Sequence, residues 1–138
     1  IDATQALGKV RLERWSFQFA SGSAHKFYGP KGVGFLYAEN PHELIPQTIG
    51  GGQESGLRSG TLNVPGIVGM GAAAEFALQD FDHNLAHAKE LREVVLEELA
   101  RVSDMRINGG SEVTPYVLSI SIQGVEAETL LLELDSSG

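Results

Sequence analysis

The pattern of apolar and polar positions predicts two strands in the first third of the chain. Residues 15–20 alternate between apolar and polar side chains, and residues 32–38 form a second run rich in aromatic and aliphatic side chains. Between these runs lies a stretch with Ser23, His25 and Lys26, followed by a turn with several glycines. The pattern therefore places Lys26 where the chain leaves a buried strand. This is an unusual position for a cation, because most lysines lie in water.

Helical periods follow in the second half. Pro65 opens a helix over the small, apolar residues 67–81, since proline favours the first helical turn. Asp82 or Asn84 is expected to cap the next helix, because short polar side chains accept hydrogen bonds from free amides. Over residues 81–102 apolar side chains recur at three- and four-residue steps, which predicts one long amphipathic helix. These apolar positions are Leu85, Ala88, Leu91, Val95, Leu99 and Val102.

The last third predicts a second, smaller α/β unit. Asn108 and two glycines mark a turn, residues 117–122 alternate as a strand that Gly124 ends, and residues 126–134 form a short leucine-rich helix. Strands and helices also alternate in the first half. The expected fold class is therefore α/β.

Composition narrows the function classes. The 138 residues suffice for about one domain, and the net charge of −8 argues against nucleic acid or an anionic membrane as a partner. No apolar run approaches a membrane span and nothing at the start resembles a signal peptide, so we expect a cytoplasmic protein. The absence of cysteine excludes a disulfide scaffold, a thiolate metal site and a thiol nucleophile within this stretch. The abrupt ends at Ile1 and Gly138 lead us to expect an internal piece of a larger protein.

Lys26 is the first candidate for chemistry. Open α/β sheets bind ligands at the edge where their strands end. A lysine that is desolvated there becomes a nucleophile, in particular a Schiff-base amine, and a solvated loop lysine is the alternative. Asp2 and Gln5 lie three residues apart and could face one ligand, although beginning a turn or capping a short helix is the more common role for an aspartate.

Two further features leave a choice between a structural and a functional interpretation. Residues 50–61 form a long glycine-rich loop that has neither the lysine of a Walker loop nor the glycine order of a dinucleotide fingerprint. A flexible surface loop and a functional loop both stay open. His83 and His87 are four residues apart and could share a helix face, but no third ligand is near them in the sequence. Two exposed histidines and no metal site are therefore expected.

Four motifs follow one another along the chain: Asp2-x-x-Gln5, Ser23-Ala24-His25-Lys26, Gly29-Pro30-Lys31-Gly32, and Gly-Gly-Gly-Gln-Glu at 50–54 with Arg58-Ser59-Gly60-Thr61. Together, in this order and spacing, they closely resemble the cysteine desulfurases, the class V branch of the aminotransferase-like enzymes that use pyridoxal 5'-phosphate (PLP). The resemblance covers essentially the whole chain and implies the α/β fold type I of PLP-dependent transferases. Residues 1–80 would be the later part of the PLP-binding large domain, 81–102 a long connecting helix, and 103–138 the start of the small C-terminal domain.

The resemblance implies a role for three residues around the cofactor ring. Lys26 would hold PLP as a Schiff base and later move protons at the substrate Cα, for which its amine must be available unprotonated. Asp2 would pair with the pyridine nitrogen and keep the ring protonated as an electron sink. Gln5 would donate a hydrogen bond to the phenolic oxygen of the ring.

Three other residues would hold the phosphate. Ser23 and His25 would bind it directly, because a dianion needs several donors. Thr61 resembles the residue that reaches the phosphate of the neighbouring subunit's cofactor, which implies a homodimer.

The implied reaction removes sulfur from L-cysteine and leaves L-alanine. An enzyme cysteine would take the sulfur as a persulfide and pass it to an acceptor protein, such as an iron–sulfur assembly scaffold or a tRNA-thiolation partner. The chain departs from the family here, because Asp135 runs directly into Ser136 and the catalytic cysteine is absent. A ring-stacking histidine and a phosphate-binding loop are expected before Ile1, and the arginine for the substrate carboxylate beyond Gly138. We therefore expect no desulfurase activity from the 138 residues alone.

Two alternatives stay open. Asp2, Gln5 and Lys26 would equally serve a selenocysteine lyase or another class V enzyme, such as an aminotransferase. The missing cysteine instead favours a catalytically inactive piece that serves as a dimerisation or scaffold module.

Overall fold

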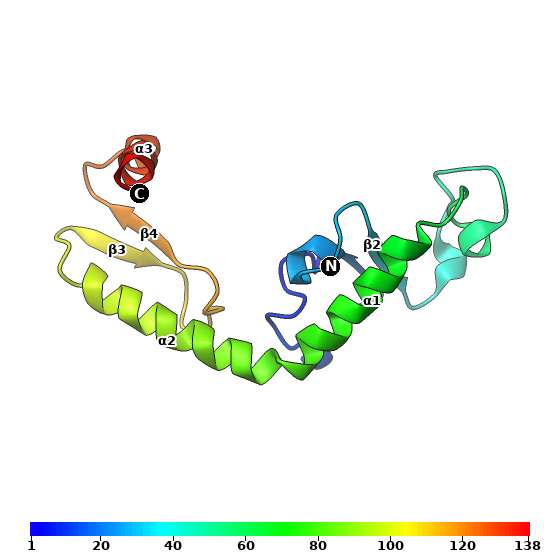
Figure 1. Cartoon of the computed structure of the whole chain (residues 1–138), viewed down its shortest axis with the longest axis horizontal. Helices are drawn as coiled ribbons and strands as arrows, with labels where there is room; N and C mark the ends of the chain where they lie inside the picture. Colours follow the sequence, from blue (N-terminus) through cyan, green and yellow to red (C-terminus); the bar gives the residue numbers. More distant parts are fainter. The chain divides into compact units, whose positions relative to one another are not determined.

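The computed structural model describes residues 1–138, apart from the side chain of Arg14. Contacts within the chain divide it into two compact units, Ile1–Asp82 and His83–Gly138. Figure 1 colours the first unit from blue to green and the second from green to red. None of the described helices is both long and apolar enough to cross a membrane. The assignment of residues 1–80 to a larger cofactor-binding domain stays a prediction.

The first unit is built on strand β1 (Phe19–Ser23). This strand pairs antiparallel with β2 (Gly34–Ala38), with Ser23 opposite Gly34 and Phe19 opposite Ala38. An isolated parallel bridge joins Asp2 to Ser21, so β1 has a neighbour on both sides. The two early strands therefore form a hairpin, and the parallel pairing is limited to the bridge at Asp2.

The predicted strand at residues 15–20 is wrong in position. Residues 15–18 lie outside any strand, and β1 begins at Phe19 and continues to Ser23. The partner strand explains the shift, because β2 ends at Ala38, opposite Phe19. The Glu39 amide still donates to the Gln18 carbonyl at 2.8 Å. The chain then enters a turn at Asn40, which accepts a hydrogen bond from the amide of His42, so residues 15–17 have no strand to pair with.

Small residues allow the elements around β1 to approach closely. Alternate residues Ala20 and Gly22 are buried, and the chain then forms a short 3-10 helix, η2 (Ala24–Phe27), with both of its end residues buried. Helix α1 (Val64–Gln79) contacts η2, as Figure 1 shows. The apolar core of this unit consists of Ala3, Ala20, Ala24, Phe27 and Phe81.

Two helices follow each other along the chain after the glycine-rich loop. Asn63 caps α1 by accepting a hydrogen bond from the Gly66 amide at 3.1 Å, and helix α2 (Phe81–Leu99) begins only two residues after α1 ends. The prediction that Asp82 or Asn84 caps the second helix is therefore wrong, since both lie inside α2. The buried side chain of Phe81 anchors the start of α2 one residue earlier, and Asp82 pairs with Arg11 at 2.6 Å instead.

The second unit contains one further hairpin and one further helix. Strand β3 (Met105–Asn108) pairs antiparallel with β4 (Ser119–Ile122), and helix α3 (Ala127–Ser137) follows. The predicted turn at Asn108, the strand ended by Gly124 and the last helix are confirmed within a few residues. Strand β3 was not predicted, and α3 continues beyond residue 134 to Ser137.

Candidate functional site

Lys26 lies in η2, directly after β1, and is half-buried. The chain turns sharply behind it, because Tyr28 adopts a left-handed conformation with φ 68° and caps η2. Helix α1 contacts η2. The lysine therefore stands on a short segment that is fixed at both ends, as its position at the end of a strand predicts.

Ser23 and His25 form a hydrogen-bonded pair beside Lys26. The Ser23 hydroxyl lies 2.8 Å from Nδ1 of His25, and the histidine is exposed. This contact occupies one ring nitrogen and orients the ring, so Nε2 is the nitrogen available to a ligand. A hydroxyl and an imidazole within one turn of an amine are suited to an anionic group.

Asp2 joins this group through its bridge to β1. Its Oδ1 accepts hydrogen bonds from the Thr4 amide at 2.9 Å and from the Ser21 hydroxyl at 3.4 Å. Hydrogen bonds from the side chain and the amide of Thr4 hold the pKa of the Asp2 carboxyl below its ordinary value of 3.8, with a smaller contribution from Ser21. The contact with Thr4 is the turn predicted as the common role for this aspartate. The exposed, ionised carboxylate is also suited to pairing with a cationic group.

Gln5 and Thr61 lie apart from these contacts. Gln5 is exposed in the turn that follows Asp2, and Thr61 is exposed just before α1. No hydrogen bond or ion pair between described residues joins either of them to Lys26 or to the Ser23–His25 pair. The structure thus places the Ser23–His25 pair and Lys26 next to one another at the end of β1 and joins Asp2 to the same strand, and the site roles of all six residues stay predictions.

The glycine-rich loop before Thr61 is held by its own hydrogen bonds. It contains a short 3-10 helix, η4 (Gln53–Gly56), and Oε1 of Gln53 accepts a hydrogen bond from the Gly60 amide at 3.2 Å. Ser59 is buried, and its amide donates to the Thr48 carbonyl at 3.2 Å. These contacts hold the loop at several points, and its functional role stays a prediction.

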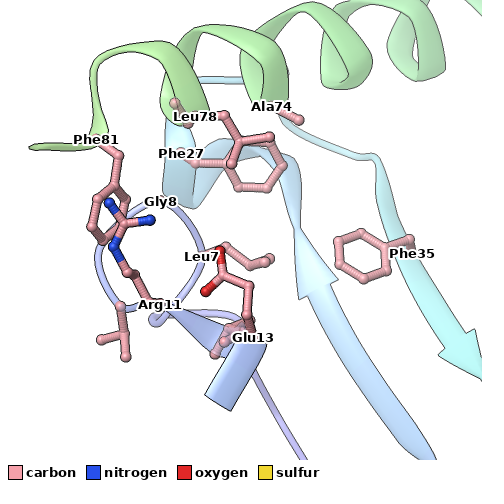
Figure 2. A pocket seen from close by; sticks show the side chains of 12 residues that line it. Leu7, Gly8, Arg11, Glu13, Phe27, Phe35, Ala74, Leu78 and Phe81 are labelled. Carbon is pink, nitrogen blue, oxygen red and sulfur yellow. The ribbon is translucent and has the colours of Figure 1, made fainter. Parts of the chain in front are cut away.

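A separate hollow, lined mainly by apolar side chains that include Phe27, lies in the first unit. It has a volume of about 350 Å³, and Figure 2 shows the side chains that line it. Arg11 stacks on the ring of Phe81, 4.6 Å from its centroid, at one end of the hollow. None of the predicted site residues lines this hollow, so the polar group around Lys26 is the better candidate for chemistry.

The two helical histidines lie in the second unit. His83 and His87 are both exposed on α2, as expected. Among the described residues, no three histidine, aspartate or glutamate side chains gather closely enough to hold a metal ion.

The whole chain, residues 1–138, matches the family model of the class-V aminotransferases. The chain belongs to the aminotransferase class-V family. This finding confirms the family resemblance predicted from the four motifs.

Curated relatives of this class-V chain carry the name cysteine desulfurase. Cysteine desulfurase IscS of Dictyoglomus turgidum is 42% identical over 141 residues, which cover 99% of this chain and 36% of the relative. Cysteine desulfurase IscS of Anaeromyxobacter dehalogenans is 44% identical over 137 residues, which cover 95% of this chain and 34% of the relative. The class-V chain therefore spans about a third of the length of these relatives.

A solved structure confirms the fold. A NifS-like protein with 41% sequence identity matches this class-V chain with a TM-score of 0.90, over 99% of this chain and 38% of that chain. The predicted α/β class and fold type I are confirmed by this likeness.

Sequence reasoning did not name the two residues that contact Asp2, Thr4 and Ser21. Thr4 lies two residues after an aspartate, which is the spacing of a turn closed by the aspartate side chain. Ser21 lies two residues before Ser23, so both occupy the same face of a strand. Both signals were present, but the contact of Ser21 with Asp2 depends on a pairing across 19 residues that no local pattern reveals.

Proposed function

We propose that this class-V chain carries the lysine-bearing part of the PLP site of a cysteine desulfurase. The main support for this proposal is the arrangement of side chains at the end of β1. Lys26 lies at the end of β1, beside the Ser23–His25 pair, and the same strand pairs with the backbone of Asp2 and donates the Ser21 hydroxyl to its carboxylate. The names of the relatives support the activity, and the shared motifs support the cofactor.

The side chains around β1 fit the chemical groups of PLP. PLP carries an aldehyde, a phosphate dianion and a pyridine nitrogen. The amine of Lys26, a half-buried residue, suits the aldehyde, the Ser23–His25 pair suits the phosphate, and the ionised carboxylate of Asp2 suits a protonated ring nitrogen. When bound, PLP supplies an electron sink for the bonds at the substrate Cα.

Each residue then has a definite task. Lys26 bonds to the cofactor and afterwards carries a proton to and from the substrate Cα. Ser23 orients the imidazole of His25, whose Nε2 donates to the phosphate. Asp2 keeps the ring nitrogen protonated by offering a negative charge. Gln5 donates to the phenolic oxygen from the turn after Asp2.

The proposal includes a second subunit and a sulfur acceptor. Thr61, on the hydrogen-bonded loop before α1, binds the phosphate of a neighbouring copy, so the protein is a homodimer. L-cysteine is converted to L-alanine, and its sulfur moves to a cysteine outside these 138 residues, because they contain none. An acceptor protein, in iron–sulfur assembly or tRNA thiolation, takes the sulfur from there, and the reaction occurs in the cytoplasm.

Visible absorption spectra of two lysine variants test the cofactor role. The natural protein over its whole length is expected to show a band of bound PLP that survives dialysis. In Lys26→Ala the band should shift to that of free PLP and disappear on dialysis, since no covalent bond retains the cofactor. Lys31→Ala is the matched control, because Lys31 is exposed in the turn after η2. A dialysis-resistant band in Lys26→Ala would contradict the proposal.

Product analysis tests the reaction. The natural protein is expected to form L-alanine from L-cysteine faster than from L-selenocysteine, whereas the reverse preference would favour a selenocysteine lyase. The 138 residues alone, supplied with PLP, are expected to form no alanine, because they lack the sulfur-accepting thiol. Alanine formation by the 138 residues at the rate of the whole protein would show that no further segment is needed.

A further inference from the structure

Two residues outside the predicted site donate hydrogen bonds to the carboxylate of Asp2. The Thr4 amide donates to Oδ1 at 2.9 Å, and the Ser21 hydroxyl donates to the same oxygen at 3.4 Å. Asp2 is exposed, so without such donors its side chain would rotate freely in water. Both bonds end on one oxygen, and they therefore set the orientation of the whole carboxylate.

The backbone holds Ser21 against Asp2. The amide of Ala3 donates to the Ser21 carbonyl at 2.9 Å, and the amide of Ser21 donates to the Ile1 carbonyl at 3.1 Å. These two bonds flank Asp2 and make the parallel bridge. The contact of the two side chains thus depends on the pairing of two backbone segments rather than on one flexible side chain.

Ser21 also lies on the same face of β1 as Ser23. Residues two apart in a strand point to the same face and lie about 7 Å apart. Ser23 contacts His25, and Ser21 contacts Asp2. One strand face therefore fixes the carboxylate and the hydroxyl–imidazole pair relative to each other, with Lys26 directly after the strand.

We propose that Ser21 and Thr4 are positioning residues of the cofactor site, which hold Asp2 through Oδ1 so that its other oxygen accepts the N–H of a protonated pyridine ring. This inference rests on the proposed function, because the ring is that of PLP. Both residues act through Asp2. Hydrogen bonds from the side chain and amide of Thr4, and a smaller one from Ser21, also lower the pKa of Asp2 and so favour its ionised form.

A double-mutant cycle on PLP binding tests this role. The dissociation constant for PLP is measured on the natural protein over its whole length, for Ser21→Ala and Thr4→Val, each with Asp2 present and in an Asp2→Asn background. Ser21→Ala is expected to weaken PLP binding about 3- to 10-fold when Asp2 is present, because a hydrogen bond to a charged group is lost. In the Asp2→Asn background its effect should be less than about 2-fold, since the residue acts through Asp2. Thr4→Val keeps the amide and should show the same dependence with a smaller loss.

Two controls separate positioning from stability of the strand. Ser21→Thr keeps the hydroxyl and should bind PLP like the wild-type protein. Ser16→Ala removes an exposed serine upstream of β1, for which no hydrogen bond to a described residue occurs, and should change PLP binding in neither background. In the protein without PLP, carbon-13 NMR should show a higher pKa of Asp2 in Ser21→Ala and in Thr4→Val than in the wild-type protein.

The outcomes distinguish the two proposals. Equal losses of PLP affinity with Asp2 and with Asp2→Asn, or an Asp2 pKa that does not change, would overturn the positioning role. The proposed function would still hold in that case, provided that the wild-type protein binds PLP. A wild-type protein that binds no PLP would overturn the proposed function and the positioning role with it.

Discussion

The buried side chains of the described structure all lie in the first unit, between Ala3 and Phe81, whereas every described side chain of the second unit is at least partly exposed. In the first unit, small residues such as Ala20 and Gly22 bring backbones close together around β1. In the second, Nδ2 of Asn108 donates to the hydroxyls of Ser119 and Ser121 across the β3–β4 hairpin, at 3.2 and 2.9 Å.

This difference explains why the candidate site lies where it does. A site that holds an amine, a carboxylate and phosphate-binding groups at fixed separations needs a rigid backbone. Close packing of small residues provides that rigidity. An exposed polar network adapts more easily, because water competes for each of its hydrogen bonds. Substitutions in the first unit should therefore affect stability and the site together, and substitutions in the second unit should affect stability alone.

The largest effect is expected at Phe27. This side chain is 5% exposed and adjoins Lys26, so Phe27→Ala should lower the free energy of unfolding by about 3 kcal/mol and weaken PLP binding. Phe76→Ala is the matched control, because Phe76 is 65% exposed on α1, and it should cost less than about 0.5 kcal/mol. Urea unfolding of the 138-residue chain measures both values. Similar losses for the two variants would contradict the described core.

A smaller effect is expected from closing the gap between β1 and β2. A Cβ atom added at Gly34 would lie 2.5 Å from the Gly22 carbonyl oxygen, so Gly34→Ala should destabilise the first unit by about 2 kcal/mol. Gly110→Ala serves as the comparison in the second unit, because no atom lies within 4 Å of an added Cβ there. Its unfolding midpoint should match that of the wild-type chain. A fully tolerated Gly34→Ala would mean that the two strands are further apart than described.

The second unit should respond to the loss of Asn108. Asn108→Ala removes three exposed hydrogen bonds, the two to the serine hydroxyls and one that its Oδ1 accepts from Nε of Arg106 at 3.2 Å, and should cost about 1 kcal/mol of unfolding free energy. PLP binding by the natural protein should not change, because no residue of the proposed site lies in this unit. Calorimetric unfolding and PLP titration of the same sample check both statements. Weakened PLP binding would contradict the claim that the site depends on the first unit alone.

The smallest effect concerns pH. Hydrogen bonds from the side chain and amide of Thr4 lower the pKa of Asp2 below 3.8, so the ionised carboxylate stabilises the folded unit above pH 3.8. This contribution is lost as the pH falls below 3.8 and through the lower pKa of the folded state. The difference in stability between the wild-type chain and Asp2→Asn should therefore be present at pH 5 to 7 and vanish toward pH 2. A stability difference between the two chains that grows as the pH falls would contradict a lowered pKa of Asp2 in the folded state.

The elements that depend on the spacing of neighbouring residues were predicted from the sequence. The helices at α1, α2 and α3, the strand β2 and the position of Lys26 after a strand all follow from periodicity and from proline and glycine positions. The start of β1 was predicted too early, because residues 15–18 alternate between apolar and polar side chains but β2 ends at Ala38, opposite Phe19. Strand β3 was not predicted for a similar reason, since its few residues form a strand only when β4 pairs with them.

The candidate site divides in the same way. Ser23, His25 and Lys26 are consecutive or nearly so, and their grouping is visible in the sequence. Ser21 gains its contact with Asp2 only through a bridge between segments far apart in the chain, so its place in the site required the structure.

Reduction of the PLP-loaded natural protein with borohydride, followed by peptide mass mapping, tests the central claim most directly. Reduction makes the bond between PLP and its lysine permanent, so the modified peptide identifies the residue. The account predicts the added mass of reduced PLP on Lys26 and an unmodified Lys31 five residues later in the same turn region. Reduced PLP on Lys31 or on any other lysine, with Lys26 unmodified, would contradict it.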